Sequence, residues 1–218
     1  MKRILRLYQE NRYFYHCFLT WYLILSWVIF SVPKQDSFLF INSKHSLFFD
    51  YFFTVITQFG DGIFVIALAL ICFFLWSRRL AVAIAATYIG SGLICSLLKR
   101  TFHTHRPGFS LHDDPNFHSL SWMPMSYHNA FPSGHTTSAF ALATCIALYS
   151  RNRSLSILAF LLACLTAYSR VYLGQHYLDD VWFGSMLGIG FSCLYALLVS
   201  YYSENRFTLS NLPSNFKI

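Results

Sequence analysis

The chain has 218 residues, of which 56% are hydrophobic and only 11% are charged, and its formal net charge is +7. Its mean hydropathy of +0.45 lies outside the balance of a soluble globular domain. This composition excludes an ordinary water-soluble fold and predicts a polytopic membrane protein. The positive charge could suggest nucleic acid, but the basic residues form no continuous stripe, so no nucleic-acid partner is predicted.

Long apolar stretches recur along the chain. A helix that spans a bilayer needs roughly 20 mainly apolar residues, and shorter stretches suffice where their flanks are interfacial. Too little polar sequence remains to cover such helices in water, and Tyr and Trp gather near several of their ends, as membrane interfaces favour. We therefore predict an all-α membrane protein with a single domain over residues 1–218. The six predicted transmembrane helices cover residues 14–32, 62–76, 80–98, 136–149, 155–168 and 181–202.

Basic residues lie beside alternate ends of these predicted spans. They precede the first span, separate the second from the third and the fourth from the fifth, and follow the sixth. They are Lys2, Arg3, Arg6, Arg12, Arg78, Arg79, Arg151, Arg153 and Arg206. Because cytoplasmic connections carry an excess of Lys and Arg, both termini are predicted to lie on the cytoplasmic side of the inner membrane. The first apolar stretch is too long for a signal peptide and has no small-residue cleavage site, so an uncleaved first span is expected.

Two connections between the predicted spans are long. The first, over residues 33–61, begins polar and then becomes rich in aromatic residues. Its Asp50 and the sequence Gly60-Asp61-Gly62 favour a helix in the membrane interface over residues 45–59 rather than a seventh span. The second, over residues 99–135, carries prolines and histidines and is expected to be an ordered external loop.

Each predicted span contains one cysteine. A buried free thiol behaves as a small hydrophobic group, and this placement argues against a disulfide framework. No redox role is expected for these side chains, which are Cys17, Cys72, Cys95, Cys145, Cys164 and Cys193.

Three short polar clusters interrupt the apolar sequence. The predicted topology places the connections after the third and fifth spans, and the entrance to the fourth span, on the outer side. Because successive spans cross the membrane in opposite directions, all three clusters are expected on one face of the membrane. The clusters are Lys99…Arg106-Pro107, Pro132-Ser133-Gly134-His135 and Ser169-Arg170…His176…Asp180.

Three cations in these clusters are candidate phosphate ligands. Lys99, Arg106 and Arg170 lie on the predicted outer side, where the positive-inside tendency disfavours them. A guanidinium binds phosphate oxygens in pairs, and a lysine acts as a point charge. The alternative is that each side chain extends toward the lipid headgroups without holding a ligand.

Residues 132–135 are predicted to form a turn that opens a helix. Ser133 is a candidate N-cap, Gly134 lets the backbone approach a ligand closely, and the exposed N–H groups attract an anion. His135 could then protonate a leaving group. The alternative for His135 is an interfacial histidine without a chemical role.

His176 and Asp180 are four residues apart, which places them on one face of a helix. A carboxylate that accepts a hydrogen bond from one ring nitrogen fixes the tautomer and leaves the other nitrogen free to attack phosphorus. Such an ionisable pair beside a membrane segment is costly and suggests function, although a structural pair is the alternative. Asp179 has the wrong spacing and is expected to face water or a neighbouring polar group.

No metal site is predicted. His103, His105 and Asp113 could be imagined as ligands, but the sequence contains no HExxH motif and no tight His/Cys grouping. The protein is therefore expected to need no metal or other cofactor.

Together the three clusters resemble the motifs of the type 2 phosphatidic acid phosphatase (PAP2) superfamily. All three occur in order, without a substituted signature residue, in a core of about residues 80–202. The resemblance implies a helical core shared with the vanadium haloperoxidases, an outward-facing site and a metal-independent reaction. It implies that His176 attacks phosphorus, that Asp180 orients it and that His135 donates the leaving-group proton. It also implies a phosphate cradle made by Lys99, Arg106, Ser133, Gly134 and Arg170.

These features predict an integral membrane phosphatase that hydrolyses a lipid phosphate or pyrophosphate on the periplasmic face through a phosphohistidine. Similar members of the family act on phosphatidylglycerophosphate, phosphatidate, undecaprenyl pyrophosphate and the phosphates of lipid A, and the sequence does not choose among these lipids. Specificity is expected to arise from the loop 107–131, the segment 45–59 and grooves between spans. The alternatives are a lipid phosphotransferase with the same intermediate, a non-catalytic lipid-binding or transport protein, and a haloperoxidase. The oligomeric state is left open.

Overall fold

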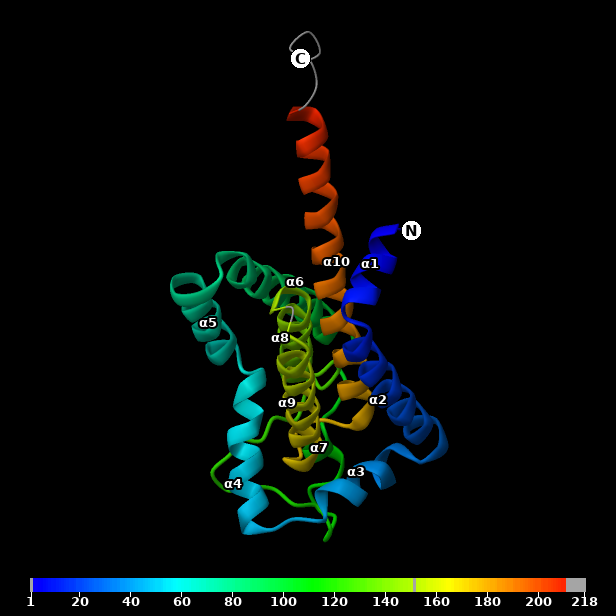
Figure 1. Cartoon of the computed structure of the whole chain (residues 1–218). Coiled ribbons are helices and arrows are strands. Elements are labelled where there is room, and N and C mark those ends of the chain that lie inside the picture. Colours follow the sequence, from blue (N-terminus) through cyan, green and yellow to red (C-terminus); the bar gives the residue numbers. More distant parts are fainter. Residues whose placement is uncertain (1, 151, 211–218) are drawn as a thin grey trace.

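The computed structural model of the protein describes residues 2–150 and 152–210. Within this part of the chain the backbone is helical or irregular, with a single isolated β-bridge between His105 and His128. The predicted all-α fold class is therefore confirmed. In chain order (Figure 1) the helices are α1 (Lys2–Glu10), α2 (Arg12–Ser31), α3 (Lys34–Asn42), α4 (Leu47–Ile56), α5 (Gly62–Ile71), α6 (Arg78–Phe102), α7 (Pro107–Ser110), α8 (Gly134–Ser150), α9 (Arg153–Tyr172) and α10 (Leu178–Ser210), with a 3₁₀ turn η1 (Thr57–Gly60) and a π-helical turn η2 (Cys72–Trp76).

Helix α8 lies at the centre of the molecule, where α6, α9 and α10 pack around it. Ten of its 17 residues are buried, and most of these are small Ala or Thr side chains. Small side chains let neighbouring backbones approach closely, which is how helices associate inside membranes. The hydrophobic core therefore surrounds a helix that few lipids can touch.

The number of spans differs from the six that were predicted. Among the described residues, four helices are long and apolar enough to cross a membrane, namely α2, α6, α9 and residues Leu178–Tyr202 of α10. The segments Leu47–Gly60 and Gly62–Trp76 pass the same test only as a pair, and they meet at a bend of 58°. The predicted span 62–76 is thus half of a broken span or of a re-entrant pair.

The predicted fourth span, residues 136–149, corresponds to α8. Seventeen residues rise only about 25 Å along a helix, less than the roughly 30 Å of a bilayer's hydrocarbon core. Because neighbouring helices cover it, α8 needs neither the length nor the uniform apolarity of a lipid-facing helix. Six is therefore an approximate count, and the sequence pattern alone could not separate a covered helix from a lipid-exposed one.

Polar side chains set the break between α4 and α5. The carboxylate Oδ1 of Asp61 accepts a hydrogen bond from the backbone N–H of Ile63 at 2.8 Å, which caps α5. The chain thus bends at Gly60-Asp61-Gly62, where an interruption was predicted. Residues 45–59 are largely helical, in α4 and η1.

Helices α1 and α3 were not predicted, and neither was the short α7 within the 99–135 loop. Helix α3 lies in a polar stretch, yet it buries Ser37, Phe38 and Asn42. Helix α1 precedes the first apolar span. Both α1 and α3 mix charged or polar residues with apolar ones, so neither was recognised as a long apolar run.

The connection 99–135 is ordered, as expected, although α6 continues to Phe102 before it begins. The side chain of Asn42 holds this loop by accepting from the backbone N–H of His118 (2.8 Å) and donating to its carbonyl (3.0 Å). The loop therefore packs onto the helices through α3.

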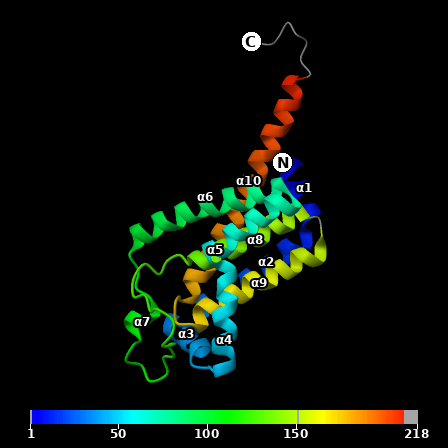
Figure 2. The ribbon, with the colours of Figure 1, turned by 90° about the vertical axis from the view of Figure 1, so that its left-hand side faces the viewer.

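The C-terminal ends of α6 and α9 and the N-terminal ends of α8 and α10 lie together, beside α7 and the 99–135 loop (Figure 2). We call this region the site end. Helix α1 and the C-terminal part of α10 lie away from it. All three polar clusters of the sequence are at the site end.

Candidate active site

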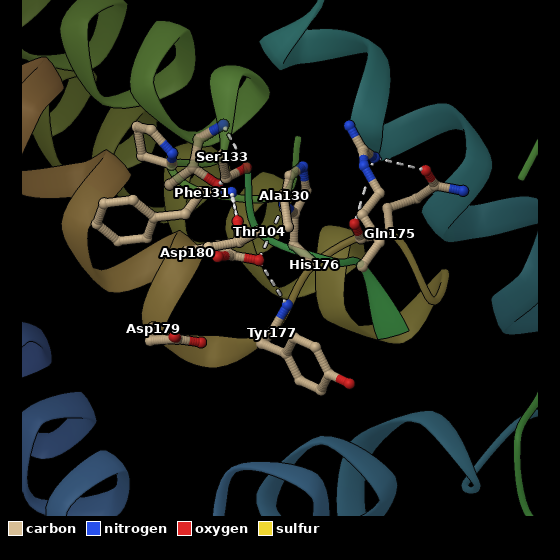
Figure 3. A network of polar contacts seen from close by, with 12 residues as sticks. Thr104, Ala130, Phe131, Ser133, Gln175, His176, Tyr177, Asp179 and Asp180 are labelled. Atoms are coloured by element: carbon tan, nitrogen blue, oxygen red, sulfur yellow. Dashed lines mark hydrogen bonds and ion pairs between the residues drawn. The ribbon is translucent and has the colours of Figure 1, made fainter. Parts of the chain in front are cut away.

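A histidine and a carboxylate are fully enclosed at the site end. His176 Nδ1 lies 3.2 Å from Asp180 Oδ2, and the two side chains are only 2% and 1% exposed. The same oxygen accepts a hydrogen bond from the backbone N–H of Tyr177 at 3.0 Å (Figure 3). His176 lies just before α10 and Asp180 lies in the first turn of that helix. The spacing of four residues therefore brings the two side chains into contact.

Asp179 points away from this pair (Figure 3). Its Oδ2 accepts from Lys34 Nζ at 2.7 Å, and both side chains are partly exposed. This matches the expectation that Asp179 faces a neighbouring polar group.

The turn 132–135 meets α10 beside the histidine. The backbone N–H of Ser133 donates to the carbonyl of Asp180 at 3.0 Å, and Ser133 Oγ accepts from the N–H of Thr136, so Ser133 caps α8 as predicted. A Cβ atom on Gly134 would approach only Cys95 Sγ, at 3.9 Å. The protein therefore leaves room beside Gly134 for a ligand.

Arg106 is held in place by carbonyl oxygens. Its Nε donates to the His128 carbonyl at 3.1 Å, and its Nη1 donates to Gln175 Oε1 at 3.0 Å and to the Gln175 carbonyl at 3.3 Å. Gln175 is buried next to His176. No motif pointed to Gln175, because its partner lies 69 residues away in the sequence.

Arg170 is almost completely buried, with 6% of its surface exposed. Its Nη1 donates to Thr57 Oγ1 at 2.7 Å, while its Nε has no hydrogen-bond partner among the described residues. A buried guanidinium N–H without a partner is costly, and an anion in the site would satisfy it. Thr57 is a second contact that sequence reasoning missed.

Lys99 reaches the same region from α6. Its Nζ donates to the carbonyl of Asn129 at 2.6 Å and lies 3.5 Å from that of Ala130. Those carbonyls belong to the segment that leads into Ser133, so Lys99 ties α6 to the turn 132–135.

His135 lies at the start of α8, ahead of its apolar stretch, and is partly exposed. Its Nε2 is 3.8 Å from Asp61 Oδ2. Sequence reasoning treated Asp61 only as part of a chain break, so this neighbour of His135 was not anticipated.

Burial and the positive charges of the site keep both histidines neutral. Burial, together with the positive charges of Arg106, Arg170 and Lys99, holds the pKa of His176 well below 6.5. Burial and the charge of Arg170 lower the pKa of His135 to about 3, against the opposing effect of Asp61. A neutral imidazole retains the lone pair that a nucleophile needs. The site therefore combines a neutral, oriented imidazole with three cations that attract an anion.

The three cations and two histidines come from α6, α8, α9 and the segments before α7 and α10, so distant parts of the chain make one site. In residues 2–150 and 152–210, His, Cys, Asp and Glu side chains form no group of three or more that could hold a metal ion. The described chemistry is that of a cationic site around an oriented imidazole. The six cysteines carry no disulfide.

Fold and site thus define a helical membrane protein with a cationic site around two neutral histidines. Residues 80–204 match the model of the PAP2 superfamily. The chain is 30% identical over 197 residues to a lipid A 1-phosphatase of Rhizobium johnstonii, covering 81% of this chain and 76% of that protein. It is 31% identical over 145 residues to the undecaprenyl-diphosphatase BcrC of Bacillus subtilis, covering 64% and 69%. The crystal structure of Aquifex aeolicus LpxE superposes with a TM-score of 0.65 at 24% identity, over 76% of this chain and 96% of that one.

The protein belongs to the PAP2 superfamily, as its motifs predicted, and it is a membrane phosphatase. The family match covers all three motifs. It begins after the segment of η1 and Asp61 that also contacts the site.

Proposed function

We propose that this protein hydrolyses the phosphate or pyrophosphate group of a membrane lipid through a phosphohistidine on His176. The observation that carries the proposal is the enclosed contact between His176 and Asp180, in a pocket where the imidazole is neutral and three cations converge. A purely structural pair would not need those cations.

In the first step the unprotonated nitrogen of His176 attacks phosphorus, and the bond from phosphorus to the lipid oxygen breaks. The Asp180 carboxylate accepts the Nδ1–H of His176 and stabilises the positive charge that develops on its ring. Lys99, Arg106 and Arg170 stabilise the negative charge on the phosphoryl oxygens.

His135 supplies the proton that the departing lipid oxygen takes. Burial and the cations disfavour its protonated form, but a bound phosphate dianion offsets the charge of the cations and raises the pKa of the ring. The imidazolium can then act as a general acid. In the second step neutral His135 takes a proton from water, the oxygen of that water attacks phosphorus, and the bond to His176 breaks.

An apolar groove supports a lipid as the substrate. A cavity of about 120 Å³ lies between α5, α8 and α9, with Phe59, Phe64, Leu142 and Leu162 among the side chains in its wall. Thr166, at its site end, is one helical turn from Arg170. An acyl or prenyl chain in this groove would extend from the phosphate pocket into the bilayer.

We assign the polar headgroup of the lipid to a second hollow, separate from the apolar groove. A hollow of about 640 Å³ opens at the site end between α3 and the 99–135 loop, with Lys34, His105, Ser110 and Tyr177 in its wall. The relatives are named for lipid A and for undecaprenyl diphosphate. These are lipids with different headgroups, so the comparison supports the class of substrate and leaves the particular lipid to assay.

We further propose that the site end faces the periplasm and that both termini are cytoplasmic, in the inner membrane. The distribution of Arg and Lys along the sequence supports this orientation. A substrate in the outer leaflet could then enter the pocket from the membrane.

The experiment is phosphate release by purified protein in detergent, with a panel of phosphatidylglycerophosphate, phosphatidate, undecaprenyl pyrophosphate and lipid A. We expect His176→Ala to lose activity on every substrate and the wild type to keep its rate with a chelator present. His112→Ala is the matched control, because His112 is an exposed loop histidine. Full activity of His176→Ala would refute the mechanism, and loss of wild-type activity on chelation would refute metal independence.

A further inference from the structure

The segment from Thr57 to Asp61 joins α4 to α5 and lies outside both the three motifs and the matched range 80–204. It nevertheless contacts two residues of the site. Thr57 Oγ1 accepts from Arg170, and Asp61 faces His135. A connection between membrane helices does not need such contacts for its own stability.

The backbone of this segment is packed against His135. A Cβ atom on Gly60 would lie 2.4 Å from the carbonyl oxygen of His135 and 2.9 Å from its Cβ atom. No residue other than glycine fits this approach without a shift of the backbone. The position of Asp61 relative to His135 is therefore fixed by main-chain contact.

The Asp61 side chain is also fixed. Its Oδ1 accepts the N–H of Ile63 at 2.8 Å, which caps α5, and its Oδ2 is directed toward His135 Nε2 at 3.8 Å. One carboxylate oxygen thus anchors the group to a helix, and the other is presented to the imidazole.

The charges around His135 make this carboxylate important. Lys99, Arg106 and Arg170 all disfavour a proton on the ring, and Asp61 favours it. The Asp180 carboxylate, by contrast, is engaged by His176. The charged and titratable groups that face His135 are Lys99 on α6, Arg106 before α7, Arg170 on α9, His176 before α10 and Asp61 before α5.

We propose that Asp61 is a positioning residue, which orients His135 and favours the imidazolium that gives its proton to the lipid leaving group. The inference rests on the proposed function, since it assigns a partner to the general acid. The site then contains two His–Asp pairs with different roles: Asp180 orients the nucleophile, and Asp61 supports the acid.

The test compares two leaving groups in Asp61→Asn, which retains an N-cap side chain and removes the charge. The alcohol of a lipid phosphomonoester departs as a poor alkoxide leaving group that needs a proton. The p-nitrophenolate released from p-nitrophenyl phosphate is a stable leaving group that does not. We expect kcat for the lipid to fall about tenfold or more, a fraction of what general acids contribute, with a much smaller loss on the aryl ester.

The pH profile gives a second readout. Because Asp61 favours protonated His135, its loss lowers the pKa of that ring in the enzyme–substrate complex. The alkaline limb of the kcat profile, where the acid loses its proton, should move to lower pH by about one unit in Asp61→Asn. Asp61→Glu, which keeps the charge, should restore the limb toward its wild-type position.

Asp113→Asn is the control, since it removes the same charge from an exposed loop side chain, and it should change neither readout. If Asp61→Asn does not fold, Asp61→Ser keeps the cap without the charge and carries the same test. Equal losses on both leaving groups with an unmoved alkaline limb would overturn the inference. Retained activity in His176→Ala would instead refute the proposed function, so the two failures are distinguishable.

Discussion

At the scale of single residues, the proposed mechanism depends on Asp180, which would determine the nitrogen of His176 that is free to react. Its Oδ2 lies against Nδ1 and is itself held by the N–H of Tyr177. Asp180→Asn keeps the size of the side chain but loses the charge that fixes the tautomer and stabilises the charged ring. We expect kcat to fall on the order of 10⁴-fold, as the same change does in the His–Asp pair of a Ser-His-Asp triad, with KM little changed. Initial rates of phosphate release measure both parameters.

The neighbouring Asp179 offers a matched control for that experiment. Asp179→Asn also removes one carboxylate from the start of α10, but this side chain pairs with Lys34 outside the pocket. It should keep near-wild-type kcat. If Asp180→Asn retained the same activity as Asp179→Asn, the orienting role of Asp180 would be wrong.

At the scale of elements, α3 fastens the 99–135 loop to the helix bundle. Asn42 is fully buried, exchanges two hydrogen bonds with the backbone of His118, and donates to the carbonyl of Tyr172 at 2.8 Å. Asn42→Ala leaves those buried groups unpaired, which should cost about 2–4 kcal/mol of unfolding free energy. Since the same loop positions Arg106, KM should also rise. Thermal unfolding and steady-state kinetics test the two effects.

The control is Asn116→Ala, in the same loop, where the side chain bonds only locally with Asp114 and is exposed. Its stability should match the wild type. A loop that is equally resistant to proteolysis in Asn42→Ala and Asn116→Ala would contradict the anchoring role of α3.

These elements also show how far the sequence could predict the site. The motif residues could be recognised because they combine charge with the end of an apolar span, a pattern that is local in sequence. The groups that support them could not. Thr57 lies 113 residues from Arg170, and Gln175 lies 69 residues from Arg106. Such contacts depend on how helices pack, and packing leaves no periodicity in a chain that is apolar almost throughout.

At the scale of the whole molecule, the apolar runs predicted the helical class but not the number of crossings. Helix α8 is covered by its neighbours, and the pair over residues 47–76 is bent at Asp61. A hydropathy pattern registers the apolar content of a segment and not what surrounds it. The alternation of α6, α8, α9 and α10 was predicted correctly, because the C-terminal ends of α6 and α9 meet the N-terminal ends of α8 and α10 at the site end.

That alternation has a consequence for orientation that can be measured. If the site end faces the periplasm, a cysteine placed at Asn116, in the exposed loop there, should react with a membrane-impermeant maleimide in intact cells. A cysteine at Arg79, which is exposed at the start of α6, lies at the opposite end of that helix and should react only after the membrane is opened. The six native thiols sit in apolar helices and are buried or half-buried, so the unchanged protein is the background control. Labelling of Arg79→Cys in intact cells, with Asn116→Cys protected, would reverse the proposed orientation and place the phosphate pocket on the cytoplasmic face.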